Sequence, residues 1–345
     1  MALIYNATFD KNTRKLSFED KAGNEIYSFT VPERAPTVDD ITKPLTFKAT
    51  QDGSSVKLTK SGSPVGDFQT SRDGGNTWTD YTINTAITLN TGDEVSFRAK
   101  NDRTSAQNIQ KFFQFQMTGK IEAWHNVMSM IRTNDFATYN NTAITSACTC
   151  LFSGCTSLTK APVLPATTLT RDCYEQMFVG CQSLTKAPEL PATTLVYGCY
   201  SYMFGRCQSL TKAPELPATT LAEYCYYYMF VGCQSLTKAP ELPATTLVYG
   251  CYYYMFENCK SLTKAPVLTA TTLAEYCYYY MFGNCQSLKE VRCEVPSSYS
   301  STQISSYAKS WLYNVSSTGT FYTNADANWP SGASGIPTGW TRVNT

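Results

Sequence analysis

Hydrophobic residues in the second half of the chain recur at a constant interval of 26 residues. A fixed period without insertions is typical of a solenoid, in which equivalent residues of successive coils lie over one another. One coil buries too few apolar side chains to offset the entropy of ordering its backbone, so several must stack. We therefore expect core ladders at positions that include Leu184, Leu210, Leu236, Phe204, Phe230, Cys207 and Cys233.

The hydrophobic spacing changes within one repeat. In TLAEYCYYYMFVGC, residues 220–233, apolar side chains recur at helical spacing, which predicts a short helix that ends at Gly232. The neighbouring segment SLTKAPELP predicts a short parallel strand over 184–187. Because proline donates no backbone hydrogen bond, we expect this strand to leave the ladder at Pro188. The repeats therefore predict an α/β solenoid.

The first half of the chain alternates between apolar and polar residues, as β-strands do. Residues 1–42 predict a β-hairpin segment with a turn at 22–24 that serves as an anchor, followed by a linker rich in proline. Residues 43–120 predict six further strands with turns roughly every ten residues, which favours an immunoglobulin-like β-sandwich.

Three further segments complete the predicted organisation. EAWHNVMSMI predicts a helix within a junction, or N-terminal cap, at 121–146. The solenoid then spans 147–293. Residues 294–345 lose the period and predict a C-terminal cap, because the last coil of a repeat array needs its edge protected. The predicted fold class is thus multidomain, with a β-rich N-terminal region followed by the capped α/β solenoid.

Composition narrows the classes of partner. The 345 residues carry a formal net charge of +1 and 43% are hydrophobic, so we expect a packed core and no binding to nucleic acid. The start, MALIYNATFDKNTRK, lacks the basic and apolar regions of a secretory signal, and no apolar run reaches the ~20 residues of a membrane helix. We expect no membrane insertion, and a trimmed signal peptide remains an open alternative.

Fourteen cysteines raise the question of metal sites and disulfides. No CxxC pair occurs and His125 is the only histidine, so no zinc site is expected. Neighbouring coils lie ~4.8 Å apart, within reach of a disulfide, but each ladder cysteine has two equivalent neighbours and no pairing is unique. We expect small buried thiols that fill the core, and no metal or cofactor.

For the other motifs we expect structural roles and not metal binding or catalysis. SRDGGNTW at 71–78 resembles the Asp-box turn of sialidases and predicts a β-hairpin turn in which Trp78 packs. NADAN at 324–328 lacks the glycine and distal glutamate of a calcium loop, and His125 has nearby serines but no G-x-S-x-G elbow. No catalytic residue is predicted. Charge balance explains the ladder of Lys186, Lys212 and Lys238 beside Glu189, Glu215 and Glu241.

Tyrosine is the residue type with functional promise. It fills several columns of the repeats, and three successive residues of the predicted helix cannot all face inward, so at least one column is exposed. An exposed aromatic column marks a surface for protein or sugar, and the alternative is that the rings only stack on one another. The candidate binding residues are Tyr227, Tyr253, Tyr279, Tyr202, Tyr228, Tyr254 and Tyr280.

Repeats of the form MF-x-x-C-x-SLTKAPELPATTL resemble the BspA-like leucine-rich repeats of Bacteroidales or of their crAss-like phages. The ending WLYNVSSTGTFYTN…GIPTGWTRV also resembles the end of such proteins, and the front half is similar to β-rich modules joined to these repeats in phage proteins. The resemblance implies a surface or virion protein that binds partners rather than catalyses. It implies no fixed set of binding residues.

We therefore expect a non-enzymatic bacteriophage virion protein, such as a capsid decoration or fibre, assembled in the host cytoplasm. Its N-terminal region would contact virion proteins, while the solenoid adheres to a host surface protein or gut glycans. One alternative is a bacterial cell-surface adhesin whose signal peptide was removed. Another is a glycan-cleaving enzyme, which requires an acidic pair in a pocket. Homo-oligomerisation is left open.

Overall fold

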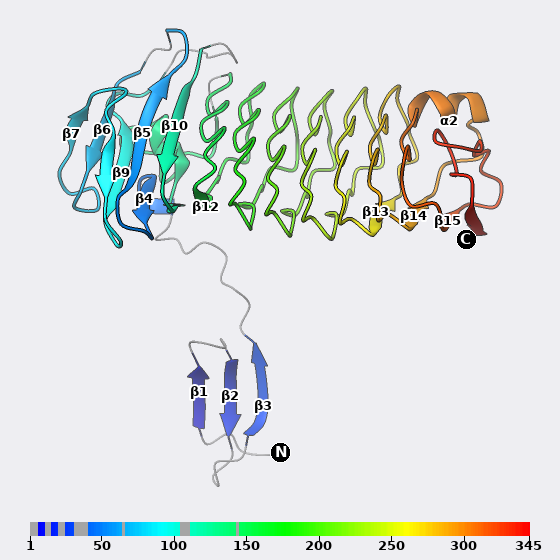
Figure 1. Cartoon of the computed structure of the whole chain (residues 1–345), viewed down its shortest axis with the longest axis horizontal. Helices are drawn as coiled ribbons and strands as arrows, with labels where there is room; N and C mark the ends of the chain where they lie inside the picture. The colour runs from blue at the N-terminus through cyan, green and yellow to red at the C-terminus, as the bar shows by residue number, and fades with distance from the viewer. Residues whose placement is uncertain are drawn as a thin grey trace. The chain divides into compact units, whose positions relative to one another are not determined.

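The structure is a computed structural model that describes residues 6–10, 15–19, 25–30, 41–63, 66–103, 111–142 and 145–345 (Figure 1). It divides into two compact units, Met1–Ile41 and Thr42–Thr345. In the first unit, β1 (Asn6–Asp10), β2 (Lys15–Glu19) and β3 (Glu25–Thr30) pair antiparallel in sequence order, as the alternating pattern predicts. The predicted turn at 22–24 lies outside the described residues.

The second unit begins with two β-sheets whose strands pair antiparallel, except for the parallel pair of β11 (Ile121–Trp124) and β12 (Leu158–Lys160). The first consists of β10, β5 and β8, and the second has the order β12-β11-β4-β9-β6-β7. The strand bounds are β4 (Thr46–Ala49), β5 (Ser54–Lys60), β6 (Phe68–Ser71), β7 (Thr79–Tyr81), β8 (Ile87–Leu89), β9 (Glu94–Ala99) and β10 (Phe113–Thr118). The two sheets pack together, since the ring centroids of Phe47 and Phe115 lie 4.6 Å apart.

All six strands predicted over 43–120 are present, and β7 is an additional strand that no pattern predicted. β7 is short and none of its residues is buried, which leaves no hydrophobic alternation to detect. The immunoglobulin-like assignment of this β-rich region stays a prediction.

The helix predicted for EAWHNVMSMI is wrong. Residues Ile121–Trp124 form strand β11, which pairs antiparallel with β4, and Val127–Met130 form the single 3₁₀ turn η1. The unpaired edge of β4 supplies hydrogen-bond partners to β11, and tertiary pairing of this kind overrides a local helical pattern. The side chain of Asn126 then caps η1 by accepting from the amide of Met128 at 2.9 Å.

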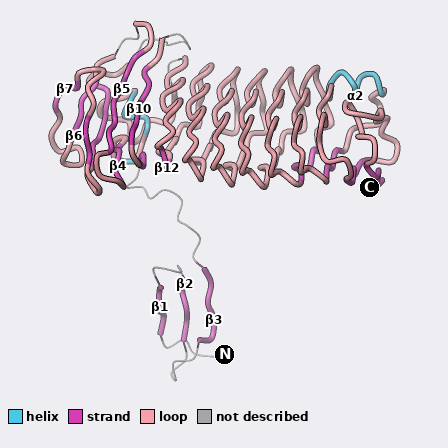
Figure 2. Tube along the Cα trace, in the orientation of Figure 1, coloured by secondary structure: helices cyan, strands magenta, loops and turns pink. Residues whose placement is uncertain are grey.

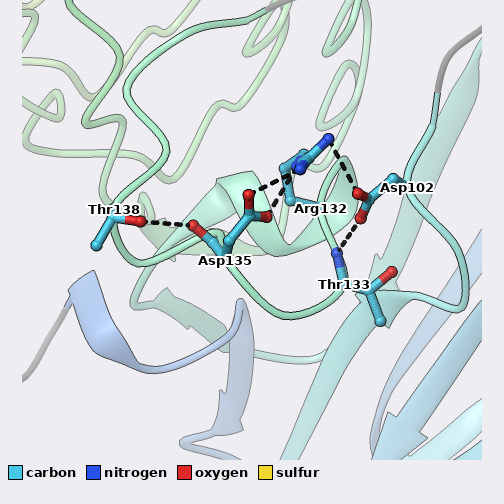
Figure 3. Close-up of polar contacts among 5 residues, drawn as sticks. All are labelled: Asp102, Arg132, Thr133, Asp135 and Thr138. Carbon is cyan, nitrogen blue, oxygen red and sulfur yellow. Dashed lines mark hydrogen bonds and ion pairs between the residues drawn. The ribbon is translucent and has the colours of Figure 1, made fainter.

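An arginine ties the junction to the preceding β-rich region (Figure 3). Arg132 forms ion pairs with Asp102 at 2.9 Å and with Asp135 at 2.7 Å. Asp102 also accepts a hydrogen bond from the amide of Thr133 at 2.9 Å, and the hydroxyl of Thr138 donates to the carbonyl of Asp135 at 3.2 Å. The cluster therefore joins Asp102, which precedes the segment 111–131 in the sequence, to Arg132, which follows it.

Successive repeats stack through regular backbone hydrogen bonds, from the amide of one residue to the carbonyl of the residue 25 positions later. The amide of Tyr226 donates to the carbonyl of Cys251 at 3.1 Å, and that of Phe230 donates to Met255 at 2.9 Å. Each coil of the stack, which we call a rung, lies directly against the next (Figure 1). Equivalent letters in the sequence therefore occupy equivalent places in neighbouring rungs.

The helix predicted within each rung is wrong, and Figure 2 shows these segments as turns. Amides of alternate residues donate within the rung, as Met229 does to the carbonyl of Tyr226, and the intervening amides donate to the next rung. Every fourth residue has a positive φ, as at Tyr224, Tyr228 and Gly232. In a helix every amide donates to a carbonyl of the same helix, so the carbonyls of the next rung would have no hydrogen-bond donors. The α part of the predicted α/β class therefore fails, and the protein is β-rich with few helices.

The opposite side of each rung carries short stretches of parallel pairing. These include β12 (Leu158–Lys160), β13 (Lys264–Leu268) and the bridges Lys186↔Lys212↔Lys238. Pro188 lies outside the ladder, as predicted. In the repeat that contains β13 the strand runs through Pro266, and there the pairing with β14 shifts register between Lys264 and Val267.

A single core runs through the second unit. Leu184, Leu210 and Leu236 are fully buried, and the rings of Phe204 and Phe230 stack with centroids 5.6 Å apart. The thiol of Cys233 donates to the carbonyl of Phe204 at 3.1 Å. The equivalent Cys207 donates to Phe178, also at 3.1 Å. All fourteen cysteines are buried free thiols, which confirms their predicted role as core fillers.

The C-terminal segment closes the last rung. Strands β14 (Glu290–Cys293), β15 (Gly319–Thr323) and β16 (Trp340–Asn344) extend the parallel pairing of β13, while α2 (Ser301–Tyr307) begins at a capping box of Ser300 and Gln303. The carbonyls of Tyr307 and Trp311 accept the last inter-rung hydrogen bonds, from Tyr278 and Phe282. No helix among the described residues has the length and apolar character to cross a bilayer.

Candidate binding site

Two of the predicted tyrosine columns are half-buried stacks on the turn side of the rungs. Neighbouring rings of the first column have centroids 4.5, 4.5 and 4.8 Å apart, in the order Tyr202, Tyr228, Tyr254 and Tyr280. In the second column Tyr227 lies 5.4 Å from Tyr253, which lies 4.5 Å from Tyr279. The column that contains Tyr226 is instead buried in the core. In both half-buried columns the rings stack on their neighbours and are also partly exposed to solvent.

A third column of tyrosines was missed by the sequence analysis. Tyr197, Tyr224, Tyr249 and Tyr276 follow one another along the stack with centroids 5.8, 5.4 and 5.5 Å apart, each pair meeting edge to face. They do not keep the 26-residue interval, because the repeats alternate between VYG at 196–198 and 248–250 and AEY at 222–224 and 274–276. This alternation was the available signal. Because of this alternation, the structural repeat of the third column is a pair of rungs.

Glycine in alternate rungs makes room for this column. A Cβ on Gly250 would lie 2.8 Å from Cε1 of Tyr224, which occupies the equivalent position one rung earlier. A Cβ on Gly198 would collide with the carboxylate of Asp172 in the same way. Two bulky residues therefore cannot follow each other at this position, which is the physical reason for the alternation.

Two cavities lie along these columns. One of about 350 Å³ is lined by Tyr224, Tyr227, Tyr249, Tyr253, Tyr276, Tyr279 and Lys309. The other, of about 330 Å³, is lined by Asp172, Glu175, Tyr197, Gly198, Ser201, Tyr224 and Tyr227. Because Tyr224 and Tyr227 line both, the cavities are adjacent, and we call them together the tyrosine groove. Of the candidate binding residues, Tyr227, Tyr253 and Tyr279 line the groove, and the other four form the stack beside it.

The hydroxyls of these tyrosines lie near one another. The hydroxyl of Tyr224 is near that of Tyr249, and the hydroxyl of Tyr227 is near those of Tyr202 and Tyr228. Burial is the main reason that the pKa of Tyr202 and of Tyr253 rises to about 12. The phenols therefore stay protonated at neutral pH, and each offers one donor and one acceptor along the groove.

Acidic groups mark the end of the groove nearest the front sheets. Burial, and then the negative charge of Asp172, raise the pKa of Glu175 to about 7. Asp172 forms an ion pair with Arg171 at 3.2 Å, and the guanidinium of Arg171 lies 4.0 Å from the ring centroid of Tyr197. At the other end the ammonium of Lys309 lies 6.0 Å from the ring of Tyr279.

Tyrosines of the groove and of the stack beside it have a strained backbone. Tyr224, Tyr228 and Tyr254 have φ of 55°, 52° and 55°, a region that costs an L-residue with a side chain about 1–2 kcal/mol. Another position of the same turns carries glycine or asparagine in most rungs, as at Gly232 and Asn258, and arginine at Arg206. Ring stacking worth about 0.5–1.5 kcal/mol per pair offsets part of the cost. The backbone alone would favour asparagine or glycine over these tyrosines.

The remaining sequence candidates have structural roles. SRDGGNTW forms the turn between β6 and β7, as predicted: Asp73 accepts from the amides of Asn76 and Thr77 at 3.0 and 2.9 Å. Trp78 packs under the guanidinium of Arg98, which lies 4.2 Å from its ring centroid.

NADAN and the residues near His125 are also used by the fold. The side-chain amide of Asn328 donates to Ser297 and Tyr299, and Arg342 donates to three carbonyls of this loop, where a calcium ion would need them as ligands. Ser129, near His125, donates to the carbonyl of Phe97 and accepts from the amide of Leu45. In the part of the chain that the structure describes, no three His, Cys, Asp or Glu residues are placed to hold a metal ion.

The stacked rungs, their leucine ladder and the half-buried tyrosines define a β-rich repeat protein with a groove lined by tyrosines. A family model described as a BspA type leucine rich repeat region matches six copies, over residues 135–263 and 198–324. The match covers more than half of the chain, which therefore belongs to the BspA-type leucine-rich repeat proteins. No curated protein and no solved structure matches the chain.

Proposed function

We propose that this protein is a non-enzymatic adhesion protein that uses the tyrosine groove as its contact surface. The observation that carries the proposal is the groove itself, two adjacent cavities lined by half-buried tyrosines, of which Tyr224 and Tyr276 have a strained backbone. Exposed aromatic side chains combine a large apolar face with a polar tip, the combination enriched at recognition sites. The BspA-type repeats support the adhesion class, and a solenoid with this groove along its turn side suits the role.

The test is attachment of the purified full chain to mucin-coated plates and to whole gut bacterial cells. We expect Tyr227→Asn and Tyr253→Asn to reduce attachment at least tenfold each. Tyr322→Ser is the matched control, since it removes a half-buried tyrosine from β15 on the strand side, near Lys264. Full attachment by both groove variants, with unchanged melting temperatures, would refute the proposal.

A glycan-cleaving enzyme is the second candidate, because Asp172 and Glu175 line one cavity and the raised pKa of Glu175 suits a general acid. We propose binding without cleavage, since Asp172 is already paired with Arg171. Incubation with mucin glycans should release no reducing ends. Release that disappears in Glu175→Gln would establish hydrolysis instead.

Two placements of the adhesion protein fit the repeats equally. We propose a bacteriophage virion protein, a capsid decoration or fibre, in which the unit Met1–Ile41 contacts other virion proteins and the rungs face the host; this rests on the division into two units. The alternative is a bacterial cell-surface adhesin. Mass spectrometry of purified virions against cell envelopes separates them: recovery from envelopes alone would exclude the virion placement.

A further inference from the structure

The ligand of the tyrosine groove can be narrowed by chemistry, an inference that rests on the proposed function. We infer that the groove binds an uncharged linear polysaccharide, laid along the stack of rungs and contacted in steps of two rungs. Three features of the groove support this: its period, its hydrogen-bonding groups and its charges.

The period of the groove is a pair of rungs. Tyr224 and Tyr276 occupy equivalent positions two rungs apart, and Gly250 lies at the same position between them. Since neighbouring rungs are ~4.8 Å apart, the pattern repeats every ~10 Å along the stack. Two linked pyranose rings span about this length. A linear chain of sugars therefore presents equivalent faces to Tyr224 and Tyr276.

The groove offers aromatic faces rimmed by hydroxyls. The ring centroids of Tyr224 and Tyr249 lie 5.4 Å apart, as do those of Tyr279 and of Tyr254 in the stack beside the groove, and in each pair the hydroxyls are near each other. Each protonated phenol can donate and accept, which complements sugar hydroxyls, while the ring faces pack against the C–H face of a pyranose. An extended peptide would need unpaired strand backbone to add to. The turn amides of Tyr224 and Tyr228 already donate to the next rung.

The charges around the groove disfavour an anionic chain. Asp172 and Glu175 line one end, and the exposed Glu223 and Glu275 directly precede Tyr224 and Tyr276 in the sequence. Arg171 is paired with Asp172, and Lys309 is the one cation among the residues that line the two cavities. Like charges across an interface lower affinity, so uronic-acid or sulfated polysaccharides fit worse than uncharged ones.

The test uses the full chain on a panel of immobilised polysaccharides. Its uncharged members are β-glucan, mannan, xylan and chito-oligosaccharide, and its anionic members are polygalacturonate and chondroitin sulfate. We expect binding to at least one uncharged member and at least tenfold weaker binding to both anionic ones. For that member, affinity should rise at least tenfold from disaccharide to tetrasaccharide, as the second pair of rungs is engaged.

Two variants test the contacts that the polysaccharide makes with each of the two pairs of rungs. Tyr224→Asn and Tyr276→Asn each remove one ring at a positive φ that asparagine tolerates, so the fold is kept, and a thermal melt verifies it. Each should weaken tetrasaccharide binding about tenfold, and the pair should abolish it. The control Tyr322→Ser should change nothing.

Failure of the inference is distinguishable from failure of the proposed function. If attachment to cells depends on the groove tyrosines but survives periodate oxidation of surface glycans, the groove binds a protein and the inference is wrong while the proposed function stands. Binding to no panel member, a preference for the anionic members, or equal affinity for disaccharide and tetrasaccharide would each overturn it too.

Discussion

The alternation of glycine and tyrosine along the groove predicts an unequal response to one chemical change. Both Gly250 and Gly232 have positive φ, 59° and 71°, so alanine at either position costs about 1–2 kcal/mol of backbone strain, partly offset by a less flexible unfolded chain. At Gly232 the added Cβ has room, since the nearest atom is Cγ of Arg206 at 3.5 Å. Gly232→Ala should therefore lower the free energy of unfolding by only about 1 kcal/mol.

Gly250→Ala should cost more because the Cβ would lie 2.8 and 3.0 Å from two ring carbons of Tyr224. The ring must move away, which forfeits its edge-to-face contact with Tyr249 at 5.4 Å. That contact is worth about 0.5–1.5 kcal/mol, in addition to the backbone strain. The expected loss is about 2–3 kcal/mol.

Urea denaturation followed by tryptophan fluorescence measures both variants, and the midpoints are compared because repeat arrays do not always unfold in one step. Gly250→Ala should also weaken ligand binding in the groove, and Gly232→Ala should not. Equal midpoints for the two variants would refute the account of why glycine and tyrosine alternate.

Three further changes test the core and the acidic end of the groove. Leu210→Ala should lower the free energy of unfolding by about 2–5 kcal/mol, since Leu210 is fully buried. The exposed control Gln208→Ala should lower it by less than about 0.5 kcal/mol. Equal losses for the two variants would contradict the core ladder. The native chain should resist thiol reagents that label all fourteen cysteines after unfolding, because burial raises the pKa of thiols such as Cys207 to about 12; rapid native labelling would be inconsistent with this. Glu175 binds its proton more tightly when folded, with a pKa of about 7 against 4.5, so its charge destabilises the fold above pH 7 and that penalty fades as the pH falls toward 4.5. Glu175→Gln should therefore stabilise the protein by about 1–2 kcal/mol at pH 8 and by little at pH 4, as thermal melts at both pH values would show; the opposite order would disprove the shift.

The ladders were readable from the sequence because stacking converts a constant interval in the chain into a constant position in space. Leu184 and Leu210 share one environment for this reason, and the same logic identified Tyr227 and Tyr253 as members of a column. The other strands of the front half could also be predicted from the sequence, since burial of one face produces a visible alternation of apolar and polar residues. The short strand β7, none of whose residues is fully buried, was not predicted.

What only the tertiary structure decided is where the backbone hydrogen bonds go. Leucine, cysteine and methionine at helical spacing satisfy a helix and a series of turns equally well, and the next rung decides between them because its carbonyls accept every second amide. The groove depends on the same packing: Tyr224 and Tyr249 occupy different positions in the repeat and meet because Gly250 leaves space for a ring from the preceding rung. The sequence by itself thus determined which residues are equivalent, and contact between rungs determined what that equivalence builds.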